Sequence, residues 1–224
     1  MNQLILVKYA AEIFLKGLNR GKFERKLLNN IKQKLEGFYE TSGIAEAVKE
    51  AGGIIMPAND EKYFKEVSIP GGVNLKSAKI HEALIEADAW INVPVLKNHG
   101  GAKMTCAMKN YMGIVWDRRF FHQNDLQQCI ADICTWQKNP VLNIVDAYRI
   151  MHQNGPQGKS AADVATLKSL IASTNIVAID TAALRLFNQV KKLDMAAVGH
   201  IGKGEALKLG TTNLDNVTIK RIKI

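Results

Sequence analysis

The chain has 224 residues, of which 47% are hydrophobic and 23% are charged, as in an ordinary globular protein with one substantial core. Its formal net charge of +9 is compatible with a nucleic-acid, phosphate or acidic partner, although charge alone identifies none of them. Three cysteines without a C-x-x-C pair suit a reduced compartment better than a disulfide framework and are too few for a self-contained four-iron cluster. No apolar run approaches the roughly 20 residues of a membrane span, so we expect a cytoplasmic protein without a membrane partner.

The first 40 residues predict a strand at residues 3–10, followed by a basic helix. The apolar stripe of this helix consists of Phe23, Leu27, Ile31 and Leu35. Its opposite face is basic and contains Lys22, Arg25 and Lys26. This face is either an ordinary solvated surface or a surface that contacts nucleic acid.

From residue 41 onward, segments with helical periodicity alternate with short apolar runs. We expect helices at residues 41–53, 79–88, 124–137 and 181–190. We expect strands at residues 54–58, 90–96, 140–147, 167–173, 175–180, 195–200 and 216–224. This order predicts an α/β fold with a mixed, largely parallel sheet flanked by helices and a short N-terminal strand–helix appendage. The predicted domains are residues 1–40 and 41–224.

The stretch from Val93 to His122 concentrates polar residues directly after an apolar run. The apolar run itself is typical of a strand that is buried on both faces of a parallel sheet. In open α/β sheets, ligands bind beyond the carboxyl ends of strands. The chain has neither the P-loop nor the Rossmann glycine signature, so a mononucleotide or dinucleotide site of those types has no support. We therefore expect a loop that binds an anionic small molecule or cofactor, although a solvated basic loop is the alternative. The candidate ligand-binding residues are Lys97, Asn98, Lys103, Thr105, Lys109, Asn110 and, in a second glycine-rich loop, Gly155.

Three residues are candidates for proton transfer. His99 lies in the polar stretch, and its side chain titrates near neutral pH. His122 precedes an expected helix, where it either joins the site or packs against Phe120 and Phe121. Asp146 ends an expected strand, where it either serves the site or caps a turn. No metal can be assigned from the sequence.

Three segments carry a resemblance to a known family: INVPVLKNHGGAKMTCAMKNYMGIVWDRRFFH, NIVDAYRIMHQNGPQGK and LIASTNIVAID. Their order and spacing resemble the later part of domain-of-unknown-function family 362, over residues 41–224. The resemblance implies an α/β fold and an association with ferredoxin-type iron–sulfur domains, but no particular reaction. It therefore implies a ferredoxin-type iron–sulfur partner in trans, linked to redox metabolism. Its motifs fall on Lys97, His99, Lys109, Asn110, Gly113, Asn154, Gly155, Pro156 and Gly158.

The N-terminal segment LILVKYAAEIFLKGLNRGKFERKLLNNIKQKL instead resembles the start of the tRNA 4-thiouridine sulfurtransferase family, which is also linked to thiamine biosynthesis. In that family the segment opens a ferredoxin-like module that helps to position tRNA. The resemblance implies tRNA binding through Lys22, Arg25 and Lys26. The remaining sulfurtransferase domains have no counterpart here, so the chain is interpreted as a fusion of two partial domains, whether natural, misjoined or designed.

These observations leave three hypotheses for the function. The first is a family-362-like protein with a site for an anionic ligand, linked to iron–sulfur redox metabolism. The second is a tRNA-binding module related to the sulfurtransferases. The third is a non-catalytic scaffold or an inactive fusion, in which the fold is kept without a working site.

Overall fold

The computed structural model describes residues 3–8 and 43–223, and the chain divides into two compact units. The larger unit comprises residues 1–11 and 64–224, and the smaller unit comprises residues 12–63. The predicted boundary near residue 40 and the basic helix before it lie outside the described residues.

The described part of the smaller unit contains helix α4 (Ile44–Glu50) and the 3-10 turn η1 (Glu61–Tyr63). Helix α4 confirms the helix that we expect within residues 41–53. The strand expected at residues 54–58 is wrong, because this stretch pairs with no strand among the described residues and the side chain of Ile54 is 84% exposed.

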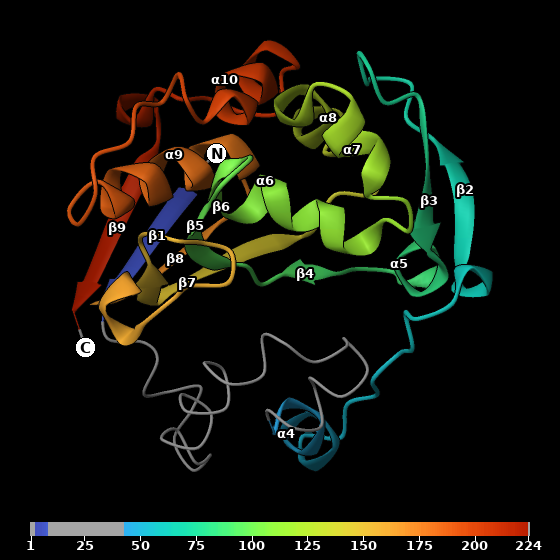
Figure 1. Cartoon of the computed structure of the whole chain (residues 1–224), viewed down its shortest axis with the longest axis horizontal. Coiled ribbons are helices and arrows are strands. Elements are labelled where there is room, and N and C mark those ends of the chain that lie inside the picture. The colour runs from blue at the N-terminus through green and yellow to red at the C-terminus, as the bar shows by residue number, and fades with distance from the viewer. Residues whose placement is uncertain (1–2, 9–42, 224) are drawn as a thin grey trace. The chain divides into compact units, whose positions relative to one another are not determined.

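The larger unit is built on a sheet in the order β6-β5-β7-β8-β1-β9, with β4 also paired to β7 (Figure 1). The pairs β1–β9, β4–β7 and β5–β7 are parallel, and the pairs β1–β8, β5–β6 and β7–β8 are antiparallel. The strands are β1 (Gln3–Lys8), β4 (Ile91–Asn92), β5 (Val95–His99), β6 (Lys103–Thr105), β7 (Leu142–Met151), β8 (Val164–Ser173) and β9 (Thr218–Lys223).

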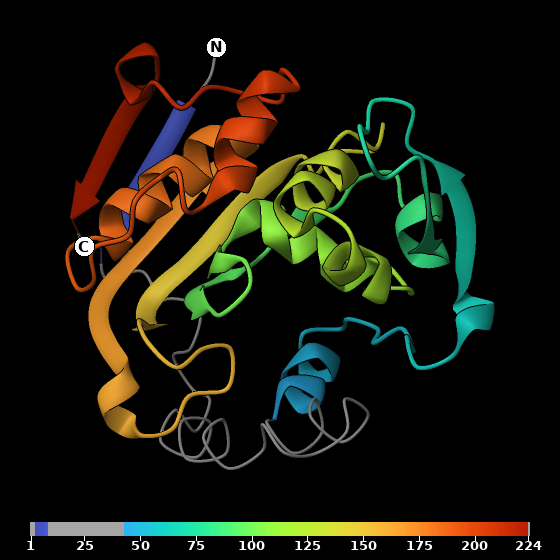
Figure 2. The same cartoon turned by 45° about the horizontal axis from the view of Figure 1, so that its top comes forward.

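The helices that follow β6 in the larger unit gather on one face of this sheet (Figures 1 and 2). The apolar core lies between the two layers, with Leu96, Val145, Ile150 and Phe187 fully buried. This arrangement confirms the predicted α/β fold with a mixed sheet flanked by helices. The helices are α6 (Ala107–Asn110), α7 (Arg119–Gln123), α8 (Leu126–Ile133), α9 (Ile176–Phe187) and α10 (Gly199–Ala206), with the 3-10 turns η2 (Tyr111–Ile114), η3 (Ala161–Asp163) and η4 (Leu214–Asn216).

The predicted N-terminal strand is confirmed as β1, which is an integral part of the large sheet. It pairs with β8 along one edge and with β9 along the other. Strand β9 then forms an outer edge of the sheet, as we expect for the C-terminal segment.

A separate two-stranded sheet pairs β2 (Phe64–Ser68) with β3 (Ser77–His81), and the short helix α5 (Glu82–Glu86) follows directly. The segment 79–88, expected as one helix, is therefore the end of a strand followed by a single helical turn. His81 marks the change, because its Nδ1 accepts the backbone N–H of Ala83 at 3.2 Å.

Two expected strands are helical. Residues 175–180 form the start of α9, where the side chain of Asn175 accepts the backbone N–H of Ala178 at 2.9 Å. Residues 195–200 form a turn and the start of α10. Both errors have one cause: the periodicity of a short apolar run does not separate a strand from a buried helix.

The apolar run 90–96 is not buried on both faces. Ile91, Val93 and Val95 are 53%, 60% and 46% exposed, whereas Asn92 and Leu96 are buried. The run also divides into two strands, β4 and the start of β5. At this point the side chains on one face of the strands are therefore buried, and those on the other face are exposed.

Candidate functional site

The hairpin of β5 and β6 carries the first part of the predicted site. Lys97 lies opposite Thr105, and His99 lies opposite Lys103. The polar residues 97–99 are therefore strand residues and not a loop, because β6 pairs with them and extends the ladder beyond the apolar run. Directly opposite residues have neighbouring side chains on one face of a sheet. The hairpin thus places the side chains of Lys97, His99 and Thr105 close together.

Asn98 attaches the second glycine-rich loop to this hairpin. Its side-chain oxygen accepts the backbone N–H of Gly155 at 3.0 Å, and its amide nitrogen donates to the carbonyl of Lys103 at 3.2 Å. The carbonyl of Gly155 accepts the N–H of Gly100 at 3.2 Å. A Cβ atom on Gly155 would lie 1.9 Å from the backbone oxygen of Asn98, so only glycine fits. Asn98 and Gly155 therefore shape the site by holding two segments together.

Helix α6 brings Lys109 to the same region. Burial, together with the positive charges of Lys109, His122 and Lys97, lowers the pKa of His99 to about 4. Burial also lowers the pKa of Lys109 to about 8, together with the charges of Arg118 and Lys97. The pKa of Lys97 is lowered by burial alone. We call Lys97, His99, Lys109 and Thr105 the basic cluster.

No carboxylate neutralises the basic cluster within residues 3–8 and 43–223. The ion pairs of this part of the chain involve neither Lys97 nor Lys109. The hydroxyl of Thr105 is buried and has no hydrogen-bond partner in the described structure. Two partly buried ammonium groups beside an unsatisfied hydroxyl form a site that is chemically suited to an anion.

The hydrogen bonds of His99 define its tautomer. The backbone N–H of Ala102 donates to Nδ1 of His99 at 3.1 Å, so Nδ1 carries a lone pair. With a pKa of about 4, the ring is neutral at pH 7 and its one proton is on Nε2. At neutral pH, His99 therefore offers an N–H donor, and its Nδ1 atom is not free to accept a proton.

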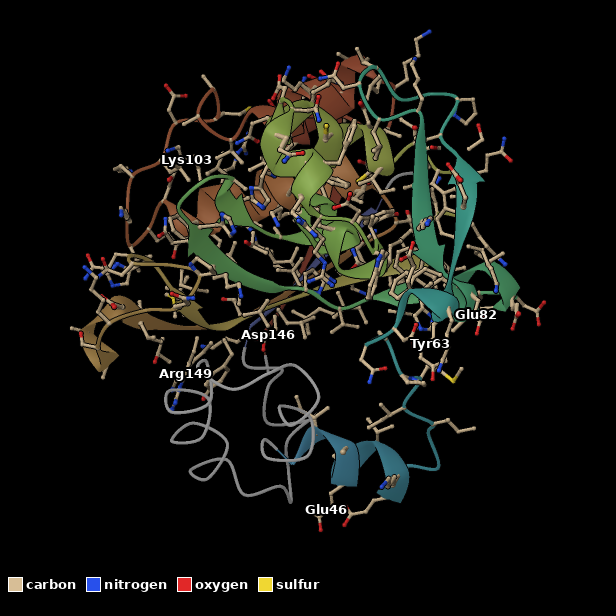
Figure 3. All side chains as sticks on the ribbon, turned by 45° about the vertical axis from the view of Figure 1, so that its right-hand side comes forward. Glu46, Tyr63, Glu82, Lys103, Asp146 and Arg149 are labelled. Carbon is tan, nitrogen blue, oxygen red and sulfur yellow. The ribbon has the colours of Figure 1, made fainter. Side chains whose placement is uncertain are left out.

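The structure does not bring Asp146 to the basic cluster. This residue lies within β7 and not at the end of the strand, opposite the exposed Val95. Its carboxylate accepts the backbone N–H of Tyr148 at 2.9 Å. Figure 3 shows Asp146 and Lys103 on opposite sides of the sheet.

Two other candidates are placed differently. His122 lies within α7, exposed, and contributes its charge to the field at His99. The amide of Asn110 donates to Asn92 at 2.7 Å, and Asn92 in turn donates to Asn143 at 2.9 Å. Asn110 therefore lies at the outer end of a series of hydrogen bonds between side-chain amides, which continues through Asn92 to the buried Asn143. The candidates Lys22, Arg25 and Lys26 lie outside the described residues.

A buried polar pair beneath α6 was missed as part of the site. Asp180 lies inside α9 and accepts the backbone N–H groups of Ala107 and Met108 at 2.8 and 3.1 Å. Nε2 of His200 lies 3.8 Å from this carboxylate. The one sequence signal was the glycine-rich segment GHIGKGEA, which contains His200.

The cysteines do not form a metal site. Cys106, Cys129 and Cys134 are fully buried, and burial raises the pKa of each thiol. Across residues 3–8 and 43–223, no group of three metal-ligating side chains could hold a metal ion. In the same part of the chain, no helix has the length and apolar character needed to cross a bilayer.

The chain is similar to several proteins named "Probable tRNA sulfurtransferase". One from Clostridium perfringens is 36% identical over 106 residues, which cover 39% of this chain and 28% of the relative. One from Clostridium botulinum is 48% identical over 66 residues, with 24% and 17% covered. A second strain of Clostridium perfringens has one that is 75% identical over 36 residues, with 16% and 9% covered. The chain thus spans less than a third of these relatives.

No solved structure matches the chain significantly. A family described as "Domain of unknown function (DUF362)" matches residues 11–185, starting well before the predicted position near residue 41. This match covers most of the sequence and confirms the resemblance seen in the motifs. The chain belongs to the DUF362 family.

Proposed function

We propose that the basic cluster binds a small anionic ligand of the phosphate or carboxylate type. The observation that supports this most is the absence of a carboxylate partner for Lys97 and Lys109 within the described part of the chain, although both are partly buried. An ammonium group that leaves water without a partner costs free energy, and the lowered pKa of each lysine expresses that cost. A bound anion would offset it.

Each member of the cluster has a distinct role in this proposal. Lys97 and Lys109 supply positive charge. His99 donates Nε2–H as a neutral ring, and Thr105 donates its hydroxyl, which otherwise has no partner in the described structure. The catalytic roles suggested by the sequence for His99, His122 and Asp146 stay predictions, as does a ferredoxin-type iron–sulfur partner in trans.

The proposal is tested by thermal melts with inorganic phosphate, sulfate and dicarboxylates. A ligand at 100 times its dissociation constant stabilises the folded state by about 2.7 kcal/mol, which is visible as a higher melting temperature. We expect one anion class to give this shift, and Lys97→Met to reduce the stabilisation at the same ligand concentration to about 0.4–1.4 kcal/mol. Lys192→Met removes an exposed lysine elsewhere and is the matched control. A melting temperature that no anion changes would favour the non-catalytic scaffold.

The affinity for sulfate is expected to depend on pH through Lys109. Sulfate keeps its charge between pH 6 and 10, whereas Lys109, with a pKa of about 8, loses its charge in this range. The affinity for sulfate should be constant below pH 7, where Lys109 is charged, and should fall about tenfold per pH unit above pH 8, where Lys109 becomes neutral. Isothermal titration at several pH values measures this. Equal affinities of the wild type at pH 6 and pH 9 would exclude Lys109 as a ligand.

We also propose tRNA binding as a second candidate, because the sulfurtransferase relatives carry tRNA in their names. If Lys22, Arg25 and Lys26 contact phosphates, changing all three to alanine should weaken tRNA binding at low salt. The slope of log affinity against log salt should also become less steep by about 2 to 3 units. Filter binding across a salt series measures both. A triple variant with the affinity and salt slope of the wild type would contradict this candidate.

A further inference from the structure

The most unusual buried groups of the larger unit are Asp180 on α9 and His200 on α10. Both side chains are completely buried, and Nε2 of His200 lies 3.8 Å from Oδ2 of Asp180. The two helices lie side by side above the sheet (Figure 1). Nε2 is also one of two buried side-chain nitrogen or oxygen atoms in the described structure that lack a hydrogen-bond partner.

The hydrogen bonds of His200 show which of its nitrogens carries a proton. Oε1 of Gln127 lies 3.0 Å from the backbone nitrogen of His200 and 2.6 Å from Nδ1. A backbone N–H can only donate, so the Gln127 atom must be the amide oxygen. An oxygen that accepts from both groups requires Nδ1 to be protonated. In the neutral ring, Nε2 therefore has a lone pair, which faces Asp180.

Asp180 cannot remain ionised opposite this lone pair without cost. Its oxygens accept two backbone N–H groups from α6, of Ala107 and Met108, but Oδ2 also faces Nε2. If neither Oδ2 of Asp180 nor Nε2 of His200 carries a proton, two lone pairs face each other away from water. If both atoms carry a proton, a buried imidazolium ion faces a neutral carboxylic acid that does not balance its charge. A single proton satisfies both groups, either as the acid beside neutral imidazole or as an ion pair.

We propose that Asp180 and His200 share one buried proton, and that anion binding at the basic cluster promotes its uptake. The second part rests on the proposed function. The link is α6, whose first N–H groups are held by Asp180 and which carries Lys109. Burial lowers the pKa of His200 most, and the charge of Lys109 lowers it in addition, so an anion bound at Lys109 removes that second contribution.

The thiol and phenol groups near the pair do not titrate in the same range. Burial raises the pKa of Cys106, Cys134 and Tyr111, so these three stay protonated. On α10 itself, Lys203 pairs with the carboxylate of Asp125 at 3.1 Å. Gln127, which contacts His200, is neutral, and Lys109, whose charge acts on His200, belongs to the basic cluster.

Nitrogen NMR of the histidine rings in the full chain tests the shared proton without a ligand. The signals of His200 are assigned by their loss in His200→Gln. We expect Nδ1 of His200 to be protonated throughout. Nε2 and the carboxyl carbon of Asp180 should report one common protonation near pH 6, where burial places the pKa of Asp180, and no second one above pH 4. An unprotonated Nδ1, or separate titrations of the two residues, would overturn the shared proton.

Saturating sulfate then tests the coupling. The midpoint of the common titration should rise by about half a pH unit in the wild type and stay unchanged in Lys109→Met. A midpoint that sulfate does not move, although sulfate raises the melting temperature, would overturn the coupling alone. Absence of any sulfate binding would overturn the anion site together with the coupling, and the ligand-free titration would still decide on the shared proton.

Discussion

Gly155→Ala is expected to lower the free energy of unfolding by about 2–4 kcal/mol, one of the two largest effects that the structure predicts. The new Cβ would lie 1.9 Å from the backbone oxygen of Asn98, and this neighbour is backbone that cannot rotate away. Relieving the contact separates the loop from β5. It also breaks the hydrogen bonds between Gly155 and Asn98 and between Gly100 and Gly155. Urea-induced unfolding measures the loss.

The control is the same substitution at an open position. Gly202 lies in α10, and a Cβ there meets no atom within 4 Å. Gly202→Ala should therefore be neutral or stabilise the fold by up to about 1 kcal/mol, because alanine favours the helix. If Gly155→Ala were as stable as Gly202→Ala, the close contact between the loop and the hairpin would be refuted.

Removing the charges of the basic cluster is expected to have the largest effect on ligand binding. Lys97→Met and Lys109→Met should each weaken sulfate binding about 10- to 100-fold, because each removes a partly buried charge that would contact the anion. Methionine keeps the length and apolar stem of lysine. It also removes an ammonium group without a carboxylate partner in the described structure, so each variant should be at least as stable as the wild type.

Isothermal titration and thermal melts together separate this result from simple loss of fold. A site residue gives weaker binding with equal or higher stability, whereas a structural residue loses both. Lys192→Met should change neither quantity. Sulfate affinities within twofold of the wild type in both cluster variants would show that the lysines do not bind the anion.

The elements with strong periodicity could be predicted from the sequence. The apolar face of Cys129, Ile130 and Ile133 predicts α8, and all three residues are fully buried. Short apolar runs are less informative, because burial demands hydrophobic side chains in helices and strands alike. The run 175–180 is one such case, and the side chain of Asn175 is the local signal for its helix.

The candidate site could be predicted in part. Lys97, His99 and Lys109 are adjacent because the β5–β6 hairpin and the short helix α6 follow one another along the chain. Asp146 does not join them, because pairing with β8 extends β7 beyond this residue, and the sequence does not show where a ladder ends. The pair of Asp180 and His200 also escapes sequence reasoning, because α9 and α10 contribute one residue each.

The most direct test of the anion site is a crystal structure with selenate, which has the charge and shape of sulfate and can be located by its anomalous scattering. The proposal predicts a selenate peak in contact with the ammonium groups of Lys97 and Lys109 and with Nε2 of His99, and a lower occupancy of this peak in crystals of Lys109→Met at the same selenate concentration. A fully occupied peak elsewhere, with the basic cluster empty at a concentration that saturates the protein in solution, would contradict it.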